Sequence, residues 1–143
     1  GKFHFIRPDI IHLLRGEIYD IEGYSVFTFG GAWSVDKDLR TPGLSWWARE
    51  MPSEEEYAHG RENLKAHGNA VDLIVSHEAP TTYLKKLYSM ARGYTLSHYL
   101  EEIDHNTDYS HWYFAHHHQE IEFDEKHSLL YNNFVYLEPK KEG

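Results

Sequence analysis

The chain has 143 residues, with 14 Lys and Arg against 23 Asp and Glu, which gives a formal net charge of −9. It contains no cysteine, and this excludes disulfide scaffolds, thiolate zinc fingers and cysteine nucleophiles. The acidic balance argues against a general nucleic-acid binder, which needs a basic face for phosphates. Histidine is the compositional outlier, with 12 residues.

Hydrophobic residues make up 41% of the chain and aromatic residues 15%, which is too rich for a disordered protein. The length suits a single domain over residues 1–143 with a sizeable core. No apolar run approaches the roughly 18 residues that cross a bilayer, and no signal-peptide core is present. We therefore expect a soluble, cytoplasmic protein that binds no membrane.

The first third of the chain has the pattern of β structure. Two β-prone runs, 17–21 and 24–29, flank the dipeptide Glu22-Gly23, and a two-residue turn of this type predicts a hairpin. Shorter extended runs precede them at 3–6 and 10–14. We therefore expect the chain to begin with short strands.

A helix is predicted over residues 54–66. Ser53 and Glu56 have the spacing of a capping box, in which each side chain hydrogen-bonds the backbone N–H of the other. Three glutamates at the start of this segment suit the positive end of the helix dipole. Gly68 marks its end.

The remaining elements alternate in type. A compact β-branched run at 71–75 predicts a strand buried on both faces, as in parallel or mixed sheets. Helix-like segments at 83–90 and 96–103 follow, then a short apolar strand at 112–115 and an alternating tail up to residue 137. This order predicts a mixed α/β or α+β domain, with a mixed sheet.

Both buried-looking strands are followed by histidine. His77 comes after the strand at 71–75, and His116, 39 residues later, comes after the strand at 112–115. Ligands of open α/β sheets bind beyond the carboxyl ends of the strands. If these strands are parallel neighbours, the helices between them form the crossover and both imidazoles lie at one edge of the sheet.

The histidine cluster adds a possible third ligand. In an extended backbone His116 and His118 would point to one side and His117 away. Convergent imidazoles suit a divalent transition metal, although the same spacing also fits a polar strand end without a metal. Ser76 and Glu78, which flank His77, are candidates for orienting its ring. The histidines elsewhere, His127 among them, are expected to be surface or hydrogen-bonded core residues.

These segments resemble the motifs of the calcineurin-like metallophosphoesterases. The stretch V-D-L-I-V-S-H-E-A-P at 71–80 is similar to the family's strand followed by T/S-H-x-x-P. The stretch F-A-H-H-H-Q at 114–119 resembles its final G-H-x-H, with Ala115 in place of Gly. The loop G-G-A-W-S-V-D-K-D-L-R at 30–40 and S-W-W-A-R-E-M-P at 45–52 resemble a bacterial and phage branch. The motifs occur in the family's order and cover most of the chain.

The resemblance implies hydrolysis of phosphomonoesters or phosphodiesters by a metal-bound hydroxide at a site for two ions of Mn, Fe, Zn or Ni. It implies that His77 and His116 bind one metal and that His118 binds the other. Asp36 and Arg40, in the upstream loop, are candidates for substrate binding, with an ion pair between the two as the alternative. The catalytic residues are not assigned by these motifs.

The family's N-terminal motifs, D-x-H, G-D-x-x-D and G-N-H-D/E, are absent from the chain. The resemblance therefore implies only the C-terminal half of a four-layer α/β/β/α sandwich, with helices on one face of the sheet. We expect at most partial metal occupancy in this chain alone, and activity only with the missing half. An isolated half would expose an apolar sheet face, covered by the N-terminal half or by a second copy. Four aromatic residues are expected near that face: Phe27, Phe29, Trp112 and Phe114.

Two other functions fit parts of this pattern. A non-catalytic interaction domain could retain the fold without the chemistry, and the missing ligands favour it for this chain taken alone. A carbohydrate-binding β domain is suggested only by the aromatic content, and the predicted helices fit it poorly. A phosphatase assay with Mn²⁺ separates the first of these from the enzyme.

Overall fold

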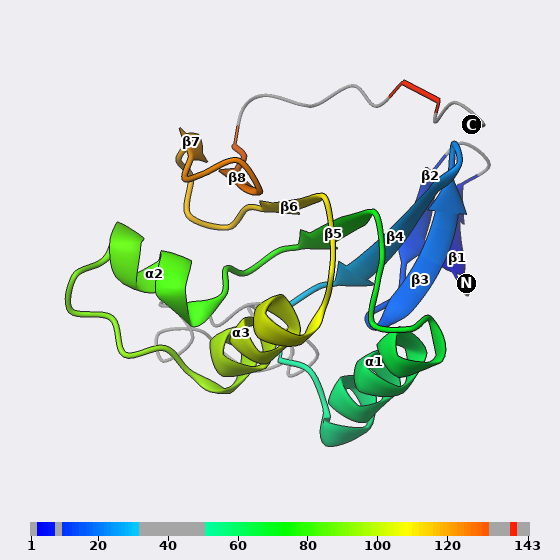
Figure 1. The fold of residues 1–143 in the computed structure, drawn as a ribbon, viewed down its shortest axis with the longest axis horizontal. Coiled ribbons are helices and arrows are strands. Elements are labelled where there is room, and N and C mark those ends of the chain that lie inside the picture. Colours follow the sequence, from blue (N-terminus) through cyan, green and yellow to red (C-terminus); the bar gives the residue numbers. More distant parts are fainter. Residues whose placement is uncertain (1–2, 8–9, 32–50, 132–137, 140–143) are drawn as a thin grey trace.

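The computed structural model describes residues 3–7, 10–31, 51–131 and 138–139, with the backbone alone described up to residue 12 (Figure 1). The order of strands and helices confirms the predicted mixed α/β class. The elements are β1 (Phe3–Arg7), β2 (Ile10–Leu13), β3 (Glu17–Ile21), β4 (Tyr24–Phe29), α1 (Glu54–Ala66), β5 (Leu73–Ser76), α2 (Thr81–Leu87), α3 (Thr95–Asn106), β6 (His111–Phe114), β7 (Ile121–Glu122) and β8 (His127–Leu129).

The main sheet has six strands in the order β3-β4-β5-β6-β8-β7, and β1 and β2 form a separate antiparallel pair. Strands β4, β5, β6 and β8 are parallel to one another, whereas β3 and β7 run antiparallel at the two edges. Leu73 of β5 lies opposite His111 of β6, and Ile74 lies opposite Trp112. The strands that precede His77 and His116 are therefore parallel neighbours, the condition on which their expected convergence depended, with α2 and α3 in the crossover.

All three helices cover the same face of this sheet, as Figure 1 shows. Tyr57 of α1 stacks on Phe29 with ring centroids 5.8 Å apart, and Tyr99 of α3 packs on the same ring at 4.8 Å. Tyr83 of α2 contacts Phe114 at 5.9 Å. Offset aromatic contacts of this kind add to the burial of apolar surface in fixing how helices sit on a sheet.

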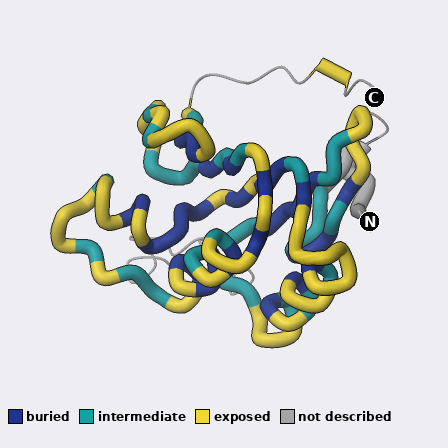
Figure 2. Tube along the Cα trace, in the orientation of Figure 1, coloured by how far each residue is buried: buried dark blue, intermediate teal, exposed yellow. Residues whose placement is uncertain are grey.

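The expectation that the large aromatic residues of the sheet lie beside an exposed face is wrong. They are at most 1% exposed and form the core beneath the helices: Phe27, Phe29, Trp112 and Phe114. Side chains alternate along a strand, so these residues share one face with Ile74, while Val75 belongs to the other. Val75 is 41% exposed, so β5 is not buried on both faces along its length. Figure 2 shows the buried strands and the exposed outer sides of the helices.

Local sequence signals set two of the element boundaries as predicted. The Glu56 N–H donates to Ser53 Oγ at 3.1 Å and the Ser53 N–H donates to Glu56 Oε1 at 3.0 Å, which completes the capping box of α1. Glu22 and Gly23 have φ angles of 53° and 87°, the left-handed pair that a tight hairpin between β3 and β4 requires. Within the described ranges, no helix has the length and apolar character that crossing a membrane demands.

Candidate functional site

The parallel strands bring their carboxyl ends to one edge of the sheet, and backbone hydrogen bonds continue past the strand ends there. The N–H of His77 donates to the carbonyl of Phe29 at 3.3 Å, and the N–H of Ala115 donates to the carbonyl of His77 at 3.0 Å. The N–H of Leu130 donates to the carbonyl of Phe114 at 2.9 Å. The segments that follow β4, β5, β6 and β8 are thereby fixed next to one another.

Two imidazoles meet at this edge. Nε2 of His77 lies 3.0 Å from Nδ1 of His116, and their ring centroids are 4.8 Å apart. Two imidazole nitrogens bound to one tetrahedral ion at about 2.0–2.1 Å stand about 3.3 Å apart, so this pair fits a shared metal with little movement. Burial lowers the pKa of His77, and the neighbouring His116 lowers it further. The predicted convergence of these two histidines is confirmed.

The backbone that follows β6 differs from the prediction. It is not extended, because φ is 76° at His116 and 53° at His118. The expectation that His116 and His118 point the same way, which assumed an extended backbone, is therefore wrong. The ring of His118 stacks on that of Tyr131, with centroids 4.8 Å apart. A left-handed conformation costs a non-glycine residue roughly 1–2 kcal/mol. Ala115, which stands where the resembled motif has Gly, has no positive φ and causes no such strain.

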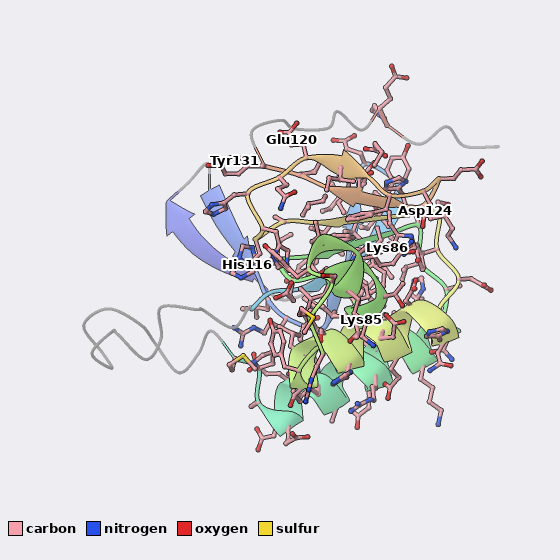
Figure 3. The ribbon with its side chains drawn as sticks, turned by 90° about the vertical axis from the view of Figure 1, so that its left-hand side faces the viewer. Lys85, Lys86, His116, Glu120, Asp124 and Tyr131 are labelled. Carbon is pink, nitrogen blue, oxygen red and sulfur yellow. The ribbon has the colours of Figure 1, made fainter. Side chains whose placement is uncertain are left out.

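The ligand set implied by the resemblance is only partly assembled. Among the residues that the structure describes, no three His, Asp or Glu side chains are grouped so as to hold one ion. His118 stacks on Tyr131. Figure 3 shows Tyr131 and His116 on the same side of the molecule. Asp36 and Arg40 lie outside the described residues. A metal held by His77 and His116 would need further ligands.

His117 and Glu78 have roles that differ from those predicted from the sequence. His117 does not point away but donates from Nε2 to Oε1 of Glu78 at 2.5 Å. Glu78 is 2% exposed and also accepts hydrogen bonds from the Ala79 N–H at 2.8 Å and the Tyr94 hydroxyl at 2.5 Å. Burial opposes ionisation of this carboxyl, but the bonds from His117 and Tyr94 outweigh it and lower its pKa. The position of Glu78 next to His77 in the sequence was the signal for an orienting group. No sequence pattern pointed to Tyr94 as its partner.

A second polar cluster lies in the core, away from this edge. His127 is 5% exposed, and its two ring nitrogens face Asp124 and Asp104 at 2.8 and 3.2 Å. The hydroxyls of Tyr83 and Tyr109 lie 2.9 and 2.6 Å from the same two nitrogens. Burial opposes protonation of His127, but the two carboxylates outweigh it and raise its pKa. This is a hydrogen-bonded core histidine, and Figure 3 shows Asp124 well apart from His116.

The candidate site is defined by the facing pair His77 and His116 and by the Glu78–His117 contact beside it. Comparison with protein-family models, with curated proteins and with solved structures gave no match to this chain.

Proposed function

We propose that this chain contributes to a metal-dependent phosphoesterase, in which His77 and His116 bind one divalent transition-metal ion. The observation that carries the proposal is the 3.0 Å approach of His77 Nε2 to His116 Nδ1 at the carboxyl edge of parallel strands. Imidazole suits the metals that the motif resemblance implies, namely Mn, Fe, Zn or Ni. Such ions supply a nucleophile from water at neutral pH and stabilise the charge that develops on phosphate oxygens.

The chain's own residues would then hold and orient this centre. His77 and His116 would bind the first ion, and His118 would turn from Tyr131 to a second one. Asp36 and Arg40 are proposed to contact the phosphoester, for which an arginine offers paired N–H donors. The carboxylate and amide ligands of the D-x-H, G-D-x-x-D and G-N-H-D/E motifs would have to come from residues outside these 143. Activity in this proposal depends on them.

The proposal includes a partner and a location. Val75 is 41% exposed on the sheet face opposite the helices, which supports contact there with the segment that carries the other ligands or with a second copy. Burying apolar surface of this kind is the usual driving force for such contacts. A cytoplasmic location completes the proposal.

The test uses two chromogenic substrates, p-nitrophenyl phosphate and bis(p-nitrophenyl) phosphate, with Mn²⁺. Both the 143-residue chain and the full gene product that contains it are assayed, each with the variant His77→Gln. The matched control is His105→Gln, because the His105 side chain is 70% exposed and lies on α3, away from the pair. Metal-dependent turnover that is lost in His77→Gln and kept in His105→Gln supports the proposal.

Two results contradict this function. Turnover that survives both His77→Gln and His116→Gln would show that the pair does not serve the reaction. Absence of turnover in the full gene product with either ester and any of the four metals would favour the non-catalytic interaction domain instead.

A further inference from the structure

Glu78 is a buried carboxylate that joins three separate parts of the chain. It is 2% exposed, and it follows His77 directly after β5. Its hydrogen-bond donors are the adjacent Ala79 N–H, the hydroxyl of Tyr94 from the start of α3, and Nε2 of His117 from beyond β6. Buried carboxylates are rare unless every oxygen has a partner, and this one is partnered on both oxygens.

The contact between Glu78 and His117 joins the same two segments as the pair His77 and His116. Glu78 is the chain neighbour of His77, and His117 is the chain neighbour of His116. The ring of His117 packs edge-on against that of His116, with centroids 4.9 Å apart. The same carboxylate-to-imidazole contact therefore fixes the two segments from which the facing nitrogens, 3.0 Å apart, project.

The segment after β6 needs such a partner. It places two non-glycine residues, His116 and His118, at φ angles of 76° and 53°, a conformation that local sequence does not favour. Strained backbone of this kind persists where the surrounding contacts determine it. The His117 side chain supplies those contacts, because it is 7% exposed and both of its nitrogens are engaged, by Glu78 at 2.5 Å and by the Tyr88 hydroxyl at 3.2 Å.

We infer that Glu78 is a positioning residue that acts through His117 to hold His116 against His77. The inference divides the histidine run by role: His117 orients the segment, and His116 presents a nitrogen to the site. Its metal-binding consequence rests on the proposed function, whereas the geometry that it assigns is a property of the protein without metal.

The metal-free protein tests the geometry. Ring ¹⁵N–¹H correlation spectra are recorded for the wild type, Glu78→Gln and His117→Gln, with Glu62→Gln as the control. Glu62 is exposed on α1, so its replacement removes the same charge far from the edge. The ring signals of His77 and His116 should shift in the first two variants and stay in place in the control. Unchanged signals in Glu78→Gln overturn the inference.

Cobalt(II) tests the consequence, with its visible absorption as the readout. Loss of an orienting partner typically weakens metal binding about 10-fold to 100-fold, and we expect this loss in Glu78→Gln and in His117→Gln. Because one residue acts through the other, the double variant should lose no more than either single one. Losses that multiply, or an affinity equal to that of the wild type, overturn the inference.

Two further results cover a variant that does not fold and a protein that binds no metal. If Glu78→Gln does not fold, Tyr94→Phe is used, because it removes a single donor to the same carboxylate. It should shift the ring signals of His77 and His116 and weaken Co²⁺ binding by a smaller factor than Glu78→Gln. No change in either measurement would overturn the inference. If the wild type takes up no Co²⁺, the proposed metal centre fails, and the ring spectra alone decide whether Glu78 holds the pair.

Discussion

The imidazole of His127 is stacked on the phenol ring of Tyr83, with centroids 4.1 Å apart and planes at 25°. One ring nitrogen faces Asp124 in the turn before β8, and the other faces Asp104 on α3. Tyr83 comes from α2, so one buried side chain joins the last strands to two helices. A charge in such a place is costly unless it is paired, and His127 is paired on both sides.

This cluster predicts a pH-dependent contribution to stability. The pKa of His127 is raised, so its protonated form stabilises the fold fully below its unfolded value of about 6.5, and this contribution is lost as pH rises through the folded value. The pKa of Asp124 is lowered to about 2 and that of Asp104 is also lowered, so their contribution is present above about 3.9 and is lost as pH falls through the folded values.

The variant His127→Gln should therefore be less stable than the wild type by about 3 kcal/mol near pH 5.5, with a smaller difference above pH 8. Thermal unfolding of both proteins from pH 4 to pH 9 measures the difference. The control Glu62→Gln replaces an exposed side chain of α1 and should follow the wild type throughout. A difference that does not vary with pH would show that His127 contributes packing alone.

Replacing Gly60 of α1 by alanine should destabilise the protein, although the same change usually stabilises a helix. An added Cβ would lie 3.3 Å from Cζ of Phe27 and closer still to the hydroxyl of Tyr99, which donates to the Tyr57 carbonyl. Gly→Ala normally stabilises a helix by about 1 kcal/mol, but overpacking costs about 1–3 kcal/mol. We expect Gly60→Ala to lower the free energy of unfolding by about 2 kcal/mol in urea titrations.

The control for this prediction is Ala58→Gly, at an exposed position of the same helix. It should cost about 1 kcal/mol through helix propensity alone. A stabilised Gly60→Ala protein would mean that α1 can move away from the sheet without loss.

The capping box predicts the cost of losing Ser53. In Ser53→Ala the Glu56 N–H loses its acceptor, and the start of α1 should lose about 1 kcal/mol. Ser53→Asp retains a side-chain acceptor and should lie within a few tenths of a kcal/mol of the wild type. Urea unfolding of both variants checks this, and equal losses in the two would contradict it.

Metal binding should raise thermal stability if the proposed centre exists. An ion that binds only the folded state at 100 times its dissociation constant adds about 2.7 kcal/mol. We expect Co²⁺ to raise the melting temperature of the wild type and of His105→Gln. The rise should disappear in both His77→Gln and His116→Gln. Equal rises in all four proteins would place the ion elsewhere.

Patterns that act over a few residues were predictable from the sequence. Ser53 and Glu56 determine where α1 begins, because each satisfies a backbone N–H of the other. The pair Glu22-Gly23 determines the hairpin, because its residues adopt the positive φ angles that the turn needs. The edge at which His77 and His116 meet followed from strand order, since parallel strands end on the same side.

Features set by distant contacts were not predictable. The conformation after β6 depends on Glu78, which is 39 residues from its partner His117. Leu73, Ile74 and Val75 of β5 are consecutive apolar residues, so hydrophobic alternation does not say which of them face the helices. The 41% exposure of Val75 was therefore not predictable from the sequence. The partners of His127 are Tyr83, Asp104, Tyr109 and Asp124, and only Asp124 lies close to it in the sequence.

The backbone hydrogen bonds that continue beyond the strand ends have a consequence for how this protein can change. They fix His77 and Ala115 by their main chains, whatever side chains the neighbouring positions carry. Insertions after His118, in the described segment between β6 and β7, would then lengthen a loop at this edge while these backbone hydrogen bonds stay in place. A longer loop there would change which molecules reach the pair His77 and His116 and would leave the aromatic core beneath it unchanged. Ligand choice at this edge could therefore change in evolution without a loss of stability.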